Sequence, residues 1–443
     1  GRSERPEIDA TFARFWKART REEAAKRARD VVKSGVSFDE ALSRLRQGRP
    51  YATNARRGFV RGERRTIYGN FSYDLWIPDG YDPARRYPLR FQLHGGATRD
   101  QEPVEEEFAA ASAANDGAGG GRRSFGAIGE TVPPRETLRG AEQIYVLPAA
   151  WREAPWWNAS QVDNLGVILD AIKRSYNVDE NRVVVSGVSD GGTGTYYMAM
   201  RETTPFASFL PMNGSMMVLS NARLEIDAEL FPGNMRNKPL FVVNGGRDPL
   251  YPERVIRPFM RHLIRGGVDI EYRPQAEAGH DTSWWPMLAQ DFEGFVERHP
   301  RRPLPESLTW EVSDRQTPGR AHWLVIDRVT NAGDLPPLDP DLNVLARDGQ
   351  REQRMYPRRR PSGRVDLLRE GNTVRMQTRG VAELTLLISP DAFDLSRPIV
   401  VEVNDRRVVE RRLEPSLDTL MKWAARDNDR TMLFAAELKV MVP

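Results

Sequence analysis

The segment Gly187-Val188-Ser189-Asp190-Gly191-Gly192 decides the fold that we expect for this chain. It follows the apolar run 183–185, which suits a strand, and it precedes residues 193–202, which suit a helix. A serine at such a strand-to-helix turn is typical of a catalytic nucleophile, and glycine neighbours leave room for a sharp, strained backbone. The G-x-S-x-G pattern alone is only moderately specific in a chain of 443 residues, so its surroundings decide the interpretation.

Histidine is scarce, which narrows the choice of a catalytic base. His280 follows the strand-like residues 270–272, and Asp248 follows the apolar run 240–243. Ser189, Asp248 and His280 therefore each come after a predicted strand, in the chain order of one class of serine hydrolases, and we expect them to form a catalytic triad. The rival acids and the other histidines fit less well, because they lie beside Ser189 or His280, within a predicted helix or outside the region: Asp190, Asp281, His262, His299 and His322.

The turn Leu93-His94-Gly95-Gly96 follows the strand-like residues 87–92. Such a glycine turn offers backbone N–H groups to a developing oxyanion. We expect the N–H of Asp190 to be one donor, and the turn Gly95-Gly96-Ala97 to supply the second. His94 itself is expected to shape this loop and border the substrate rather than to transfer protons.

Aromatic residues near these loops are candidates for substrate binding. Trp156 and Trp157 follow a strand ending near residue 147, and Trp284 follows His280. Aromatic faces suit acyl chains, phenolic rings or sugars, although the same side chains could instead pack the loops. The predicted substrate-binding set is His94, Trp156, Trp157, Asn213 and Trp284, with methionines around Asn213 as either a pocket wall or core.

Residues 65–300 resemble an α/β-hydrolase of the serine esterase and polyhydroxybutyrate-depolymerase-like kind, and more distantly the hydrolase domain of prolyl oligopeptidases. The resemblance is carried by the run 176–183 before the elbow and by Ile77-Pro78-Asp79-Gly80-Tyr81 followed by Tyr87-Pro88-Leu89. It covers a little over half of the chain. It implies a carboxylic-ester hydrolase that works through an acyl-enzyme on Ser189. The glycine-rich stretch 99–138 departs from the minimal pattern.

The length predicts two or three domains. Residues 1–58 form an expected helical segment, with capping patterns at Thr20 and Ser37 and an apolar patch expected to brace the hydrolase core. Residues 59–300 form an expected α/β-hydrolase domain with a mostly parallel sheet, and 306–443 a β-sandwich-like accessory domain in which Asn404-Asp405 turns a hairpin. Within it, 331–342 and 347–363 are expected to be loops. The expected catalytic-domain strands are 73–77, 89–93, 144–147, 183–186, 209–212, 240–243 and 270–272.

Composition excludes several classes of protein. The chain has no cysteine, which excludes disulfides and thiolate chemistry, and its net charge is only +3. We expect no metal site and no cofactor. The sharpest basic run, Arg358-Arg359-Arg360, lacks interleaved aromatics and is expected to be a solvated loop rather than a nucleic-acid contact. No apolar run approaches the ~18 residues of a membrane span, so we expect a soluble chain.

Several questions stay open at this point. The chain does not start with Met, so both the cytoplasm and export with a removed signal remain open, as in a bacterial exported protein. The oligomeric state, the acyl group and the leaving group of a small or medium ester, including polymer-derived esters, are also open. The alternative functions are a serine peptidase of the prolyl-oligopeptidase type and a non-catalytic binding protein on a hydrolase scaffold.

Overall fold

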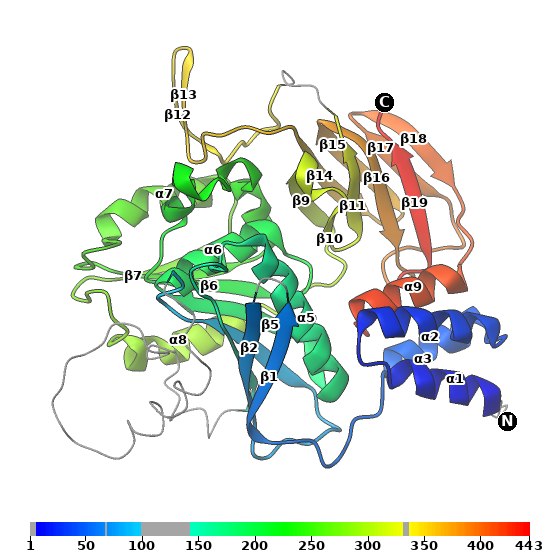
Figure 1. The fold of residues 1–443 in the computed structure, drawn as a ribbon. Coiled ribbons are helices and arrows are strands. Elements are labelled where there is room, and N and C mark those ends of the chain that lie inside the picture. Colours follow the sequence, from blue (N-terminus) through cyan, green and yellow to red (C-terminus); the bar gives the residue numbers. More distant parts are fainter. Residues whose placement is uncertain (1–5, 67–68, 99–141, 331–335) are drawn as a thin grey trace.

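The computed structural model describes residues 6–66, 69–98, 142–330 and 336–443. Its main feature is an eight-stranded sheet in the order β1-β2-β4-β3-β5-β6-β7-β8 (Figure 1). The first two strands run antiparallel to their neighbours, whereas β3 to β8 pair in parallel. The strands are β1 Gly58–Thr66, β2 Gly69–Ile77, β3 Tyr87–Leu93, β4 Ile144–Pro148, β5 Val178–Val188, β6 Ser208–Met212, β7 Leu240–Gly245 and β8 Ile270–Gln275. Every strand predicted in this region is confirmed, and the glycine-rich stretch 99–138 lies outside the described residues.

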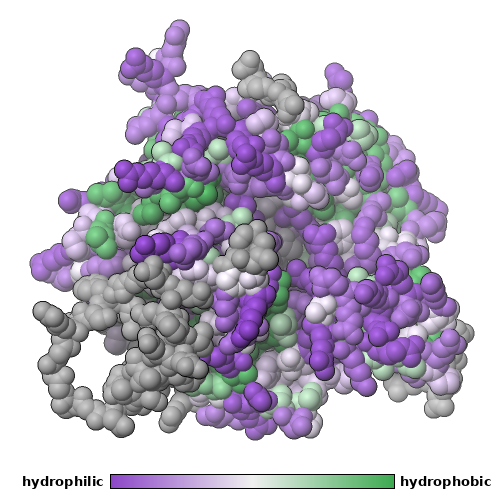
Figure 2. Space-filling view, viewed as in Figure 1, coloured by the Kyte–Doolittle hydropathy of each residue, from purple (hydrophilic) through white to green (hydrophobic). Residues whose placement is uncertain are grey.

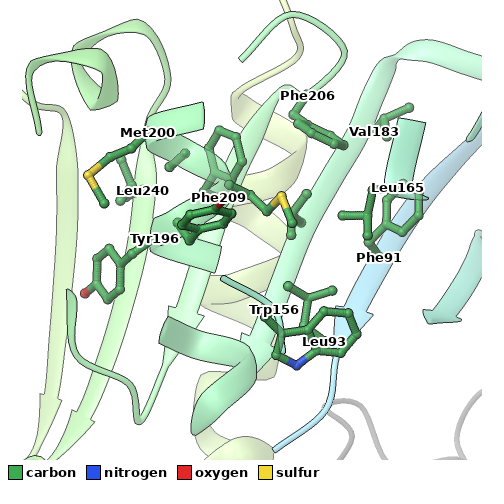
Figure 3. Packing of buried hydrophobic residues seen from close by; sticks show 14 of the residues in the cluster. Phe91, Leu93, Trp156, Leu165, Val183, Tyr196, Met200, Phe206, Phe209 and Leu240 are labelled. Atoms are coloured by element: carbon green, nitrogen blue, oxygen red, sulfur yellow. The ribbon is translucent and has the colours of Figure 1, made fainter. Parts of the chain in front are cut away.

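Helices cover both faces of this sheet because its central strands are apolar on both sides. Val183, Val185 and Phe209 point toward one face, where they pack against α5 Ala159–Ser175, α6 Asp190–Arg201 and α7 Glu253–Arg265. Val184 and Phe241 point toward the other face and pack against α8 Trp285–Arg298. Figure 3 shows part of the first of these cores, in which Phe206 and Phe209 from one strand region and Tyr196 and Met200 of α6 belong to one cluster.

A second core lies between two further sheets, which face one another in Figure 1. One sheet has the order β10-β11-β16-β19 and the other β18-β17-β15-β14-β9. This arrangement is the β-rich accessory part expected from the sequence, and Asn404 and Asp405, both at positive φ, turn the predicted hairpin. The strands are β9 Ser307–Ser313, β10 Gly319–Ala321, β11 Leu324–Val329, β14 Ser362–Glu370, β15 Thr373–Arg379, β16 Val381–Ile388, β17 Ile399–Val403, β18 Arg406–Arg411 and β19 Ala436–Met441.

The N-terminal helices pack differently from our expectation. Helices α1 Pro6–Trp16, α2 Arg21–Lys33 and α3 Phe38–Gln47 form, and the Thr20 and Ser37 side chains cap α2 and α3. Their apolar faces share one core with α9 Leu417–Asp427, so the apolar patch does not pack on the hydrolase core as predicted. The contacts with α5 of the hydrolase part are polar, from Arg21 to the Gly166 carbonyl (3.2 Å) and from Arg174 to the Ala18 carbonyl (3.2 Å). Helix α9 contributes the buried residues Leu420, Met421 and Ala424 to this core.

Residues 347–363 were expected to be a loop, and that expectation is also wrong. They include the end of β12 Val344–Asp348 and all of β13 Arg351–Arg354, which form a hairpin, and β14 already begins at Ser362. From Arg347 to Arg354 the hairpin residues are polar or charged on both faces, so no apolar alternation indicates strands there. Figure 1 shows this hairpin projecting above α7, apart from both large sheets.

The chain on either side of this hairpin belongs to the hydrolase core. We call residues 342–356 the strap. Leu342, Met355 and Tyr356 are buried in the same apolar cluster as β3, β5 and α6. Leu342 lies against α7, where a Cβ on Gly266 would come within 1.9 Å of the leucine Cδ2, and the His262 Nε2 lies 2.9 Å from the Leu342 carbonyl. The accessory part of the chain thus contributes to the core of the hydrolase part.

One face of the molecule is largely polar. Figure 2 shows a face dominated by hydrophilic residues, with apolar residues in smaller, separate patches. Among the described residues, no helix combines the length and the apolar character that crossing a membrane requires.

The packing of the strap gives a first prediction. Leu342→Ala should lower the free energy of unfolding by about 2–5 kcal/mol, because it leaves a cavity in the hydrolase core. Leu368→Ala, at a half-exposed leucine of β14, is the matched control and should cost about 1 kcal/mol or less. Chemical denaturation measures both, and equal losses would contradict the assignment of the strap to the core.

Candidate active site

The turn between β5 and α6 places Ser189 at the carboxyl end of the sheet. Ser189 adopts φ 59° and ψ −119°, a strained conformation for a residue with a side chain. The turn closes so tightly that a Cβ on Gly191 would lie 1.9 Å from the Leu93 carbonyl oxygen. Hydrogen bonds from the Ser189 N–H to Met212 O (2.9 Å) and from the Thr193 N–H to Ser189 O (3.0 Å) hold the strained residue in place.

Three side chains from separate loops meet at this turn. The His280 Nε2 lies 2.8 Å from the Ser189 Oγ, and the His280 Nδ1 lies 2.7 Å from the Asp248 Oδ2. Asp248 is fully buried, and its second oxygen accepts the backbone N–H groups of Leu250 (2.7 Å) and Tyr251 (3.0 Å). These bonds fix the carboxylate, so that it orients the imidazole toward the serine.

The glycine turn after β3 lies directly against the serine. A Cβ on Gly95 would sit 3.8 Å from the Ser189 Oγ, and Gly96 has a positive φ of 66° that favours glycine. The Ala97 N–H, however, donates to the Asp190 Oδ2 at 2.8 Å. The expectation that Ala97 supplies an oxyanion donor is therefore not supported, because a carboxylate already takes its N–H.

The positions of these groups in the sheet identify the fold. The nucleophile candidate follows β5, the acid follows β7 and the histidine follows β8, on a sheet whose second strand is antiparallel. The chain has the α/β-hydrolase fold.

No protein-family model matches the chain. A bifunctional acetylxylan esterase/xylanase of Neocallimastix patriciarum is 26% identical over 132 residues, which is 29% of this chain and 18% of that protein, so the match spans less than a fifth of the relative's length. Similar solved structures are a thermostable esterase (18% identity, 55% of this chain and 63% of that one, TM-score 0.40), a ferulic acid esterase (21%, 54% and 98%, 0.38) and Pyrococcus horikoshii acylaminoacyl peptidase (15%, 56% and 43%, 0.40).

Two residues predicted to bind substrate instead hold the glycine turn of this α/β-hydrolase. The His94 Nε2 accepts the Ala150 N–H at 3.0 Å, and its Nδ1 lies 2.7 Å from the Gly95 carbonyl oxygen. The Trp156 Nε1 donates to the His94 carbonyl at 2.8 Å, and its ring is fully buried beside the imidazole. Trp156 is fully buried and therefore does not face a substrate, whereas His94 is only partly buried beside the glycine turn.

Two further predicted substrate residues hold the histidine loop. The Asn213 Nδ2 and the Trp284 Nε1 both donate to the Asp281 carbonyl at 2.8 Å, one residue after His280. Both side chains are buried, as is Trp157 in the hydrolase core. The position of these residues after predicted strands thus identified the correct loops. It did not distinguish residues that line a pocket from residues that hold the loops in place.

The sequence reasoning missed Tyr251. Its half-buried ring meets the His280 imidazole edge to face, with the ring centroids 5.9 Å apart. Burial, together with the negative charges of Asp190 and Asp248, raises the pKa of the Tyr251 hydroxyl to about 12, so the hydroxyl stays protonated at neutral pH. Its place three residues after Asp248 was the available signal. Within the described part of the chain, no cluster of three or more potential metal-ligating side chains occurs.

The hydrogen bonds of His94 predict a pH dependence of stability. Burial disfavours the charged imidazolium and lowers the pKa of His94 below its ordinary value of 6.5. The neutral ring is also the form whose Nε2 can accept the Ala150 N–H. Below about pH 6.5, His94 is therefore protonated more readily in the unfolded chain than in the folded protein. The free energy of unfolding falls as the pH is lowered through this range. Relative to His94→Gln, the wild type should lose up to about 1.4 kcal/mol per pH unit between pH 7 and 5. Urea unfolding across this range measures the difference, and a difference independent of pH would exclude this role.

Proposed function

We propose that the protein is a serine hydrolase that cleaves carboxylic esters through an acyl-enzyme on Ser189. The observation that carries this proposal is the hydrogen-bonded line from Ser189 through His280 to Asp248 at the strained turn. A complete line of this kind favours catalysis over a binding function on a disabled scaffold.

In the proposed reaction, His280 acts as the general base. Its Nε2 takes the proton of the Ser189 hydroxyl as the Oγ attacks the ester carbonyl, and later returns it to the leaving alcohol. Asp248 keeps the Nδ1 proton facing the carboxylate and stabilises the imidazolium. The two backbone donors to Asp248 keep the carboxylate from rotating away during this step.

The oxyanion would be stabilised by backbone N–H groups on both sides of the serine. One is the N–H of Asp190 at the start of α6, and the others belong to the Gly95-Gly96 turn. The bond from Ala97 to the Asp190 carboxylate ties the turn to the nucleophile residue. A single donor of this kind contributes about 10²–10³ in rate.

The proposed substrate is a small or medium ester with an apolar part. Leu250 is well exposed and Tyr251 half-buried beside His280, so the acid loop offers apolar surface near the nucleophile. The named esterase activity of the Neocallimastix relative, over its short matched region, agrees with an ester and leaves a carbohydrate-linked one open. Peptide hydrolysis is the alternative that the assay below must exclude.

Ser189→Ala should abolish hydrolysis of p-nitrophenyl acetate, with kcat falling by about 10⁴–10⁶, because triad members act as a unit. Ser396→Ala, at an exposed serine of the accessory part, is the matched control and should keep full activity. Steady-state kinetics on the ester and on a peptide chromophore are measured together. Equal turnover by Ser189→Ala would exclude Ser189 as the nucleophile, and cleavage of the peptide alone would replace the esterase with a peptidase.

A further inference from the structure

The strap places one tyrosine deep in the hydrolase. Tyr356 is fully buried, and its hydroxyl donates to the Met216 carbonyl at 3.0 Å. The Tyr356 backbone is fixed at both ends by Asn343, whose Oδ1 accepts its N–H (2.8 Å) and whose Nδ2 donates to its carbonyl (3.0 Å). Burial raises the pKa of Tyr356 well above its ordinary value, so the hydroxyl remains a neutral donor across the working pH range.

Met216 lies one residue beyond a turn that touches the nucleophile helix. This turn comprises residues 213–215, and Thr193 belongs to α6. The Thr193 hydroxyl accepts the Ser215 N–H (3.2 Å) and donates to the Ser215 carbonyl (3.3 Å). The Thr193 N–H in turn donates to the carbonyl of Ser189 at 3.0 Å. A continuous series of contacts therefore runs from Tyr356 through residues 215–216 and Thr193 to the strained serine.

The turn also lies against the first residues of α6 without room to move. A Cβ on Gly214 would come within 2.6 Å of the Thr193 backbone nitrogen and 2.7 Å of the Gly192 carbonyl carbon. Asn244 fixes the same turn from β7, because its Nδ2 donates to the Gly214 carbonyl at 3.1 Å. With backbone packed on backbone, a displacement of the turn is passed to α6 rather than absorbed by flexible side chains.

The segment after Met216 is held by residues that follow the strap. The Arg358 guanidinium donates to the Ala222 carbonyl at 2.7 Å, and the buried Asp227 carboxylate accepts the Arg358 N–H at 3.2 Å. Arg359 and Arg360 pair with Glu352 (3.6 Å) and Asp314 (3.1 Å). Arg358 thus contacts this segment at Ala222 and Asp227, and Arg359 and Arg360 pair with acidic residues of the accessory part. These contacts give the basic run 358–360 a structural role that is separate from the proposed catalysis.

We propose that Tyr356 is a positioning residue of the active site, through which the accessory part of the chain sets the geometry of the nucleophile turn. This inference rests on the proposed function of Ser189. The Tyr356 hydroxyl touches no reacting atom, so its effect is on the placement of Ser189 relative to His280 and the oxyanion donors. Misplacement by about 1 Å is enough to cost about 10²-fold in rate, and a partial release of the turn should cost less.

The test compares two tyrosines that each lose only a hydroxyl. Tyr356→Phe should lower kcat about tenfold with little change in KM, and by the same factor at every pH, since the hydroxyl does not titrate. The control is Tyr176→Phe, because the Tyr176 hydroxyl also donates to a backbone carbonyl, that of Arg56 at 3.0 Å, but lies before β5 at the end of the strand remote from Ser189. Thermal melting of both variants shows whether a lower kcat comes from a general loss of stability or from a displaced Ser189.

A second pair of variants tests the path itself. Thr193→Val should lower kcat, whereas Thr193→Ser, which keeps the hydroxyl, should restore it. If both sites act through one path, the fold-losses of Tyr356→Phe and Thr193→Val should be non-additive in the double variant, and those of Tyr176→Phe and Thr193→Val should multiply.

The outcomes are distinct. A wild type that neither hydrolyses esters nor reacts with a fluorophosphonate at Ser189 would overturn the proposed function itself. If the wild type is active, equal kcat values for Tyr356→Phe and Tyr176→Phe, or fully multiplicative losses with Thr193→Val, would overturn the positioning role.

Discussion

The strained backbone at Ser189 is the constraint on which the arrangement of the site depends. A side-chain-bearing residue at φ 59° persists only if its surroundings enforce the conformation. Here the enforcement comes from three directions. β5 leads into the turn, the Met212 carbonyl accepts the serine N–H, and the Leu93 carbonyl lies so close to Gly191 that no other residue fits. The strain presents the hydroxyl at the edge of the sheet, where loops after β3, β7 and β8 can reach it.

Each of those loops is fixed by buried groups behind it. His94 and Trp156 hold the glycine turn, Asn213 and Trp284 hold the carbonyl after His280, and the acid loop closes on Asp248 through two N–H donors. A triad needs such support because its hydrogen bonds alone do not determine where three separate loops lie. The accessory part adds a further layer, since the strap completes the core under α6 and α7.

The sequence predicted the elements that carry strong local signals. The alternation of Val183, Val184 and Val185 between two apolar faces fits a parallel strand covered on both sides, and Asn404-Asp405 carries its turn preference within two residues. The glycine spacing around Ser189 and the small number of histidines were enough to select Asp248 and His280 as the partners of Ser189. Their catalytic roles stay predictions until activity is measured.

What the sequence could not supply depended on long-range packing. Trp156 lies in an expected loop, but whether its indole faces a pocket or donates inward to a carbonyl depends on His94, a partner 62 residues away. The partner of helices α1–α3 is α9, which lies almost at the other end of the chain. Tyr356 reaches Met216 across 140 residues, with no pattern in either segment that points to the other.

The central claim is that Ser189 forms a covalent acyl intermediate. Intact-protein mass spectrometry after acid quenching during turnover of an activated ester tests it most directly, with peptide mapping to locate the adduct. We expect one acyl group per chain on the peptide that contains Ser189. A stable turnover with no adduct on that peptide, or an acyl group on another residue, would contradict it.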